Sequence, residues 1–184
     1  MNATGTRGLG GSWSWLSPQA LLVAASLVVA AAILLAGGEA GRALSGIGGA
    51  LWIAAAVWML AGLRNEPRRA PVALVALAGA AVMAVIVRPG TYLEAIVGFG
   101  LAGAAVGVAA GPSALRWAML PAALYFPLHI AVAIGRVIAS GGERAVRTDP
   151  PPTAALVQVA MVAAAAAGGW LAWKALSGRE SAGG

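Results

Sequence analysis

Long apolar runs alternate with short polar breaks along the chain. Six runs approach the length of a membrane-spanning helix, and they cover residues 19–36, 43–63, 70–87, 92–111, 117–140 and 153–176. The hydrocarbon core of a bilayer is about 30 Å thick, so a spanning helix needs roughly 20 residues at about 1.5 Å of rise each. The runs are continuous instead of alternating apolar with polar positions, which favours helices over membrane β-strands. We therefore predict an all-α, polytopic membrane protein with a bundle of six transmembrane helices.

The breaks between these runs combine charged residues with glycine or proline. They are GGEAG at 37–41, RNEPRR at 64–69, RPGT at 88–91, GPSALR at 111–116 and GGERAVRTDPPP at 141–152. Glycine and proline end helices, and charged side chains require water. We expect one transmembrane domain over 19–176, with mobile tails at 1–18 and 177–184 that are rich in Gly and Ser. A cleaved signal peptide is disfavoured, because no small-residue cleavage site precedes a soluble region.

The amino-acid composition excludes several classes of chemistry. Of the 184 residues, 60% are hydrophobic and only 10% are charged, whereas a soluble domain carries about 25% charged residues. Cysteine is absent, which excludes disulfides, thiolate catalysis and thiol-bound metals. The net charge of +6 lies in the short connections, so it indicates membrane topology and contact with anionic lipid. No nucleic-acid partner is expected.

The positions of Lys and Arg predict the orientation of the six helices. One side, which also carries both termini, holds Arg7, Arg64, Arg68, Arg69, Arg116, Lys174 and Arg179, and the other holds Arg42, Arg88, Arg136, Arg144 and Arg147. Cytoplasmic loops carry the excess of basic residues, so we predict that both termini are cytoplasmic. All tryptophans except Trp52 fall near the same side, as in an interfacial aromatic belt. Composition points to the inner membrane of a bacterium.

The single histidine, His129, lies close to the middle of the fifth apolar run. Tyr125 precedes it by one helical turn on the same face, and Pro127 between them removes a backbone N–H and predicts a local kink. Two interpretations stay open. In one, Tyr125, Pro127 and His129 line a proton-responsive site or a solute path. In the other, His129 is a neutral structural residue that is hydrogen-bonded to Tyr125 or to a neighbouring helix.

Glu94 is a charged residue a few positions inside the fourth run, on the same side of the membrane as Arg136. An unpaired carboxylate in lipid would either be protonated or strongly destabilise the fold. We therefore predict an intramembrane ion pair of Glu94 with Arg136 on the next, antiparallel helix. Arg88, in the preceding turn, is a competing partner.

Small residues in the fourth run predict close helix packing. Gly103, Gly107 and Gly111 recur every fourth residue and share one helix face, and Gly100 precedes them. Such rows let two helix backbones approach each other, which matters because lipid provides no hydrophobic force between helices. Packing inside the bundle is favoured over a face for a second copy or for another subunit.

The absence of reactive groups argues against an enzyme. One histidine cannot supply the paired axial ligands of a membrane haem or a multi-histidine metal site. No aspartate lies in a predicted span, so the acidic clusters of metal-dependent transferases are missing. The sequence contains neither a nucleophile elbow nor a P-loop. We therefore predict no catalytic residue, no cofactor and no metal.

Three functional hypotheses follow. The leading one is a non-catalytic membrane component that associates with itself or with other membrane subunits in the lipid bilayer. The alternative is a small-solute channel or carrier with a path past His129, because Gly- and Pro-interrupted helices can line a cavity. A weaker alternative is an intramembrane enzyme, which would need a second catalytic group within about 2.6–3.2 Å of His129 or Glu94.

Overall fold

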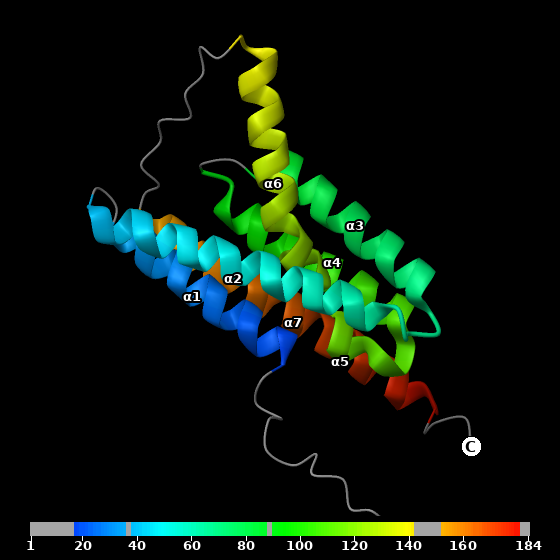
Figure 1. Ribbon diagram of the computed structural model, residues 1–184. Helices are drawn as coiled ribbons and strands as arrows, with labels where there is room; N and C mark the ends of the chain where they lie inside the picture. Colours follow the sequence, from blue (N-terminus) through cyan, green and yellow to red (C-terminus); the bar gives the residue numbers. More distant parts are fainter. Residues whose placement is uncertain (1–16, 36–37, 88–89, 142–151, 181–184) are drawn as a thin grey trace, which may run out of the picture.

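The computed structural model describes residues 17–35, 38–87, 90–141 and 152–180, and these form helices joined by short turns (Figure 1). The all-α prediction is confirmed for this part of the chain. The elements are α1 (Pro18–Leu34), α2 (Glu39–Leu63), α3 (Arg69–Ile86), α4 (Tyr92–Ala110), the 3₁₀ turn η1 (Gly111–Ser113), α5 (Ala114–Trp117), α6 (Leu120–Ala139) and α7 (Pro152–Glu180).

Five helical segments are long and apolar enough to cross a bilayer. They are Glu39–Leu63, Arg69–Ile86, Tyr92–Trp117, Leu120–Ala139 and Thr153–Gly178, and they indicate a multi-pass membrane protein in contact with lipid. The first predicted span forms the apolar helix α1, which has 17 residues and is therefore about 25 Å long. The structure thus shows five candidate spans and one shorter apolar helix.

The predicted tails differ from the observed helix ends. Helix α1 already begins at Pro18, where the Ser17 hydroxyl caps it by accepting a hydrogen bond from the Ala20 N–H at 3.1 Å. Proline suits the first helical turn because the missing N–H would have no partner there. At the other end, α7 continues to Glu180, so residues 177–180 are helical. The rest of both predicted tails lies outside the described residues.

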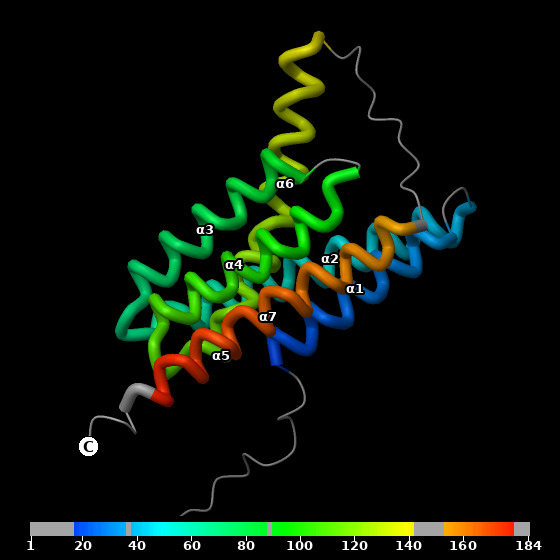
Figure 2. The backbone as a smooth tube through the Cα atoms, turned by 180° about the vertical axis from the view of Figure 1, so that it is seen from behind, coloured from blue at the N-terminus to red at the C-terminus, as the bar shows by residue number. Residues whose placement is uncertain are grey.

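The six long helices of the described chain form a ring in the order α1, α2, α6, α3, α4, α7, and α7 returns to α1. Helices α1 and α2 form an antiparallel hairpin, and α3 and α4 form another (Figures 1 and 2). The first half of α6 fits between these hairpins, whereas its second half stands clear of the other helices in both views. The ring therefore joins segments that are far apart in the sequence.

The fifth predicted span, 117–140, begins later than expected. Helix α4 stops at Ala110 because Gly111 adopts a φ of +62°, which favours glycine, and Pro112 follows it. The chain then makes the η1 turn and the single turn of α5 before α6 starts at Leu120. This compact connection positions Ser113 and Trp117 at one end of the bundle.

An aromatic cluster fills the centre of the ring. Trp52 of α2 stacks on Phe126 of α6 with ring centroids 5.4 Å apart, and Phe99 of α4 meets Tyr125 of α6 edge-on at 5.1 Å. The Trp52 indole N–H also donates to the carbonyl of Ala122 at 3.2 Å. Large aromatic surfaces with a satisfied N–H suit a buried position. The cluster fixes α6 between α2 and α4.

Three of the four predicted packing glycines, Gly100, Gly103 and Gly107, face α7. A Cβ added to Gly103 would collide with the backbone of Ala165. Because side chains are missing from both surfaces, the two helix backbones lie in direct contact. The fourth residue of the row, Gly111, ends α4 instead, and beside it lies an arginine side chain of the α2–α3 connection.

Candidate functional site

The structure brings Tyr125 and His129 together on α6. The Tyr125 hydroxyl lies 3.4 Å from His129 Nδ1, and the two ring centroids are 5.2 Å apart. The His129 ring also interacts with the backbone of Ala84 in α3. Tyr125 is buried and His129 is half-buried. Both of these contacts are made within the chain, and they leave the two interpretations of His129 open.

Pro127 lies inside α6, and the helix continues through it to Ala139. Beyond Pro127 the helix leaves the bundle. Accordingly, the exposed fraction of the side chain rises from 39% at Ile130 to 55% at Ile134 and 73% at Ile138. This projecting half of α6 carries Arg136, which is also exposed. It offers helix surface that the rest of the described chain does not cover.

Glu94 and Arg136 are both exposed, and the structure records no ion pair between them. Arg88 lies outside the described residues. Glu94 occupies the first turn of α4 and lines an apolar cavity of about 590 Å³ between α3 and α4. We call this cavity the α3–α4 groove. The remaining residues that line it are Val75, Ala78, Gly79, Val82, Met83, Ile86, Gly98, Leu101, Ala102 and Ala105.

Basic side chains gather at the other end of the bundle. Here α2 ends, α3 begins, η1 and α5 follow α4, and α7 ends. We call this region the basic end; its described side chains include Arg64, Arg68, Arg69, Arg116 and Lys174, against the one carboxylate of Glu66. Exposed tryptophans lie here as well, namely Trp58, Trp170 and Trp173. Such rings are typical of the depth of lipid headgroups.

Glu66 forms a buried polar node at the basic end. Its side chain is only 8% exposed. One carboxylate oxygen accepts a hydrogen bond from the Trp117 indole N–H at 2.8 Å, and the other accepts one from the Ser113 hydroxyl at 3.2 Å. Hydrogen bonds to both oxygens compensate the cost of burying this group. The node ties the α2–α3 connection to the connection between α4 and α6.

Sequence patterns did not identify this node. The sequence places Glu66 in a polar break between two spans and predicts Trp117 in the interfacial belt, whereas the Trp117 side chain is only 1% exposed. The two residues are 51 positions apart. Neither periodicity nor a local motif relates residues at that separation. Only the approach of two connections at one end of the ring brings them into contact.

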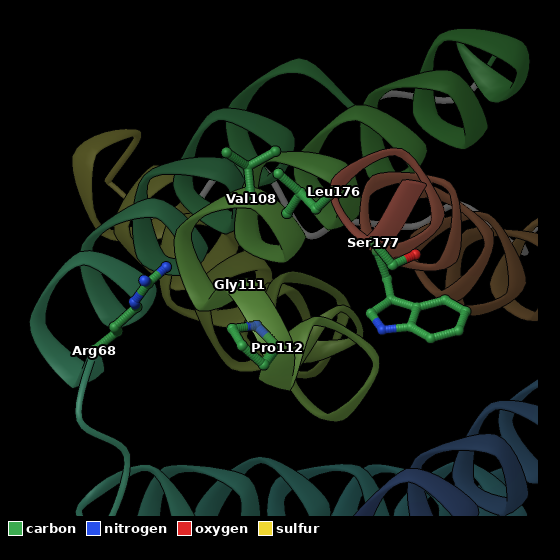
Figure 3. A pocket seen from close by; sticks show the side chains of 7 residues that line it. Arg68, Val108, Gly111, Pro112, Leu176 and Ser177 are labelled. Carbon is green, nitrogen blue, oxygen red and sulfur yellow. The ribbon is translucent and has the colours of Figure 1, made fainter. Parts of the chain in front are cut away.

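A cavity of about 430 Å³ opens beside the node (Figure 3). We call it the Arg68 pocket, and its lining residues are Arg68, Val108, Gly111, Pro112, Trp173, Leu176 and Ser177. In the close view Arg68 lies on one side of the Gly111–Pro112 turn and Ser177 on the other. The Arg68 guanidinium passes so close to Gly111 that an added Cβ would lie 2.6 Å from one of its nitrogens.

No protein-family model, curated protein or solved structure matches this chain. Among the side chains that the structure describes, no group of three His, Cys, Asp or Glu is close enough to hold a metal ion. The polar features described above are the Glu66 node, the Tyr125–His129 pair, the exposed Glu94 and the Arg68 pocket.

Proposed function

We propose that the protein is a six-span, non-catalytic component of the bacterial inner membrane that assembles with a second copy of itself. The observation that carries this proposal is the exposed carboxylate of Glu94 in the apolar α3–α4 groove. A carboxylate that faces lipid without a partner is costly, so intramembrane acidic residues normally pair with a cation. In this proposal the cation that pairs with Glu94 belongs to the second copy.

Helix α1 is the sixth span in this proposal. Its first turn reaches the basic end, where the Gln19 side-chain amide donates to the carbonyl of Arg116 at 2.7 Å. Its last turn packs on the start of α2, since a Cβ added to Gly41 would collide with the carbonyl of Leu35. A helix that joins both ends of the bundle supports an even number of crossings. Both termini then share the basic end, which the excess of Lys and Arg assigns to the cytoplasm.

The charges of the two exposed elements are complementary. Glu94 lies in the first turn of α4 and Arg136 in the last turn of α6, and both turns face the end of the bundle opposite the basic end. In the proposed dimer, the projecting half of α6 from one copy enters the α3–α4 groove of the other. Arg136 of the partner subunit then lies beside Glu94, and the pair is removed from lipid.

The shape of the groove suits a helix as its occupant. Small residues line it on both sides, including Ala78 and Gly79 from α3 and Gly98, Ala102 and Ala105 from α4. Their spacing on α4 places the last three on one face. Gly79 and Gly98 let α3 and α4 approach each other, since an added Cβ would meet Ala102 or Met83 of the facing helix. Val82, Ile86 and Leu101 are exposed in the groove, so they offer apolar contacts to the second copy.

Cysteine crosslinking tests the dimer directly, because the chain contains no natural cysteine. Two differently tagged copies are expressed together, one with Leu101→Cys in the groove and one with Ile134→Cys on the projecting half of α6, where the side chain is exposed. Membranes are then treated with a short bismaleimide. The proposal expects a mixed-tag dimer. The matched control replaces Leu101→Cys with Leu27→Cys, which is exposed on α1 at the far side of the ring. Equal crosslinking from Leu27→Cys, or none from the groove pair, overturns the proposed interface.

A small-solute path past Tyr125, Pro127 and His129 is the alternative function. None of these residues lines the α3–α4 groove, the Arg68 pocket or the third cavity of about 260 Å³ beside Arg116. A His129→Cys variant in intact vesicles distinguishes the two proposals. Labelling by a membrane-impermeant thiol reagent would favour a water-filled path. Protection at position 129, with loop cysteines that do react, would favour the membrane component.

A further inference from the structure

The Arg68 pocket combines groups that suit a phosphate with groups that suit an acyl chain. Arg68 offers a guanidinium and Trp173 an indole N–H, while Val108 and Leu176 provide apolar walls. The Ser177 hydroxyl also lines the pocket, but it donates to the carbonyl of Lys174 at 3.1 Å. Arginine presents its donors as a planar fork that matches two phosphate oxygens. A phospholipid is divided in the same way as the pocket, because it joins a charged phosphate headgroup to apolar acyl chains.

No carboxylate among the described residues forms an ion pair with Arg68. Glu66 is the nearest carboxylate in the sequence, but Trp117 and Ser113 donate to its two oxygens. Arg69 donates to the carbonyl of Arg64 at 3.4 Å, whereas the Arg68 side chain makes no hydrogen bond to another described residue. Because the surrounding basic end is cationic as well, its potential attracts an anion into the pocket.

Gly111 determines where the Arg68 side chain lies in the pocket. A φ of +62° favours glycine at this position. The missing Cβ also leaves room for the guanidinium, since any Cβ would lie 2.6 Å from Arg68 Nη1. Alanine at Gly111 would therefore displace the arginine without changing a charge. Gly111 is a positioning residue for this pocket.

The depth of the pocket in the membrane favours a lipid over a soluble anion. Val108 faces outward from α4, and Trp170 and Trp173 are exposed on α7 beside it. The Lys174 ammonium lies 5.2 Å from the Trp170 ring centroid, an arrangement typical of the membrane interface. We propose that the Arg68 pocket binds the phosphate headgroup of an anionic phospholipid, with Arg68 on the phosphate and the acyl chains along Val108 and Leu176.

Lipid retention by the purified protein tests this site. The full chain is prepared in a neutral detergent with phosphatidylglycerol, phosphatidylcholine or inorganic phosphate, and bound molecules are counted by native mass spectrometry. Hydrogen bonds to charged groups contribute about 1.5–3 kcal/mol, so we expect Arg68→Gln to weaken phosphatidylglycerol binding about tenfold or more. Gly111→Ala should weaken it similarly. Arg68→Lys, which keeps the charge but lacks the fork, should give an intermediate loss.

The matched control is Arg64→Gln, which removes the same charge from the same end without touching the pocket. We expect it to change phosphatidylglycerol binding less than about twofold. Equal losses for Arg64→Gln and Arg68→Gln would overturn the site in favour of a diffuse surface potential. Retention of phosphatidylcholine as tight as that of phosphatidylglycerol would also overturn it. Displacement of the lipid by inorganic phosphate at equal concentration would assign the pocket to a soluble phosphate.

Discussion

Substitution of Trp117 by phenylalanine tests the Glu66 node quantitatively. The change removes the indole N–H that donates to Glu66 Oε2 at 2.8 Å and leaves that buried oxygen without its donor. Loss of a hydrogen bond to a charged group costs about 1.5–3 kcal/mol. The smaller ring also leaves a void at a fully packed position, which adds about 1–2 kcal/mol. We therefore expect the free energy of unfolding to fall by about 2.5–5 kcal/mol.

A second background separates the hydrogen bond from the packing. In Glu66→Gln the acceptor is neutral, so the same Trp117→Phe change loses a bond of only about 0.5–1.5 kcal/mol together with the same void. The two losses should therefore differ by about 1–2 kcal/mol, which is the coupling energy of a double-mutant cycle. Reversible unfolding in mixed micelles with increasing SDS, followed by tryptophan fluorescence, measures all four proteins.

The control for this cycle is Trp58→Phe. Trp58 is exposed at the same end of the bundle, and replacing an exposed ring should change the free energy of unfolding by less than about 0.5 kcal/mol. If Trp117→Phe costs the same in both backgrounds, the charge of Glu66 does not contribute through this bond. The reasoning about the node would then be refuted, and Trp117 would act by packing alone.

Three further predictions concern the helix contacts. Gly103→Ala should destabilise the fold by about 1–3 kcal/mol or more in the same SDS titration, because its Cβ meets the backbone of α7; Gly46→Ala, which has open space around it, should be neutral or slightly stabilising. Trp52→Phe should cost about 2 kcal/mol through its lost bond at 3.2 Å and weaker stacking. Glu94→Arg should abolish the groove crosslink, and Arg136→Glu added to it should restore the crosslink; no recovery in the double variant would contradict the proposed ion pair.

The sequence by itself determined the class of the protein and the course of most helices. Continuous apolar runs of about 20 residues can satisfy their backbone in lipid only as helices, and glycine, proline and charge ended these runs close to the observed helix ends. The first run also ended close to the ends of α1, but α1 comprises 17 residues and is shorter than the five candidate spans. The spacing of Gly103 and Gly107 identified a surface for close approach, because helical periodicity is a local property of the chain.

The partners of these surfaces were decided only by the tertiary structure. Apolar runs of similar composition do not specify which helix follows which around a ring, so the contact of α4 with α7 and the insertion of α6 were not predictable from spacing. The same holds for Glu66 and Trp117, which meet only because two connections close on each other at the basic end. Likewise, Glu94 and Arg136 share one end of the bundle, but α6 projects away from it. The direction of α6 depends on helix tilt and long-range packing, which local periodicity does not encode.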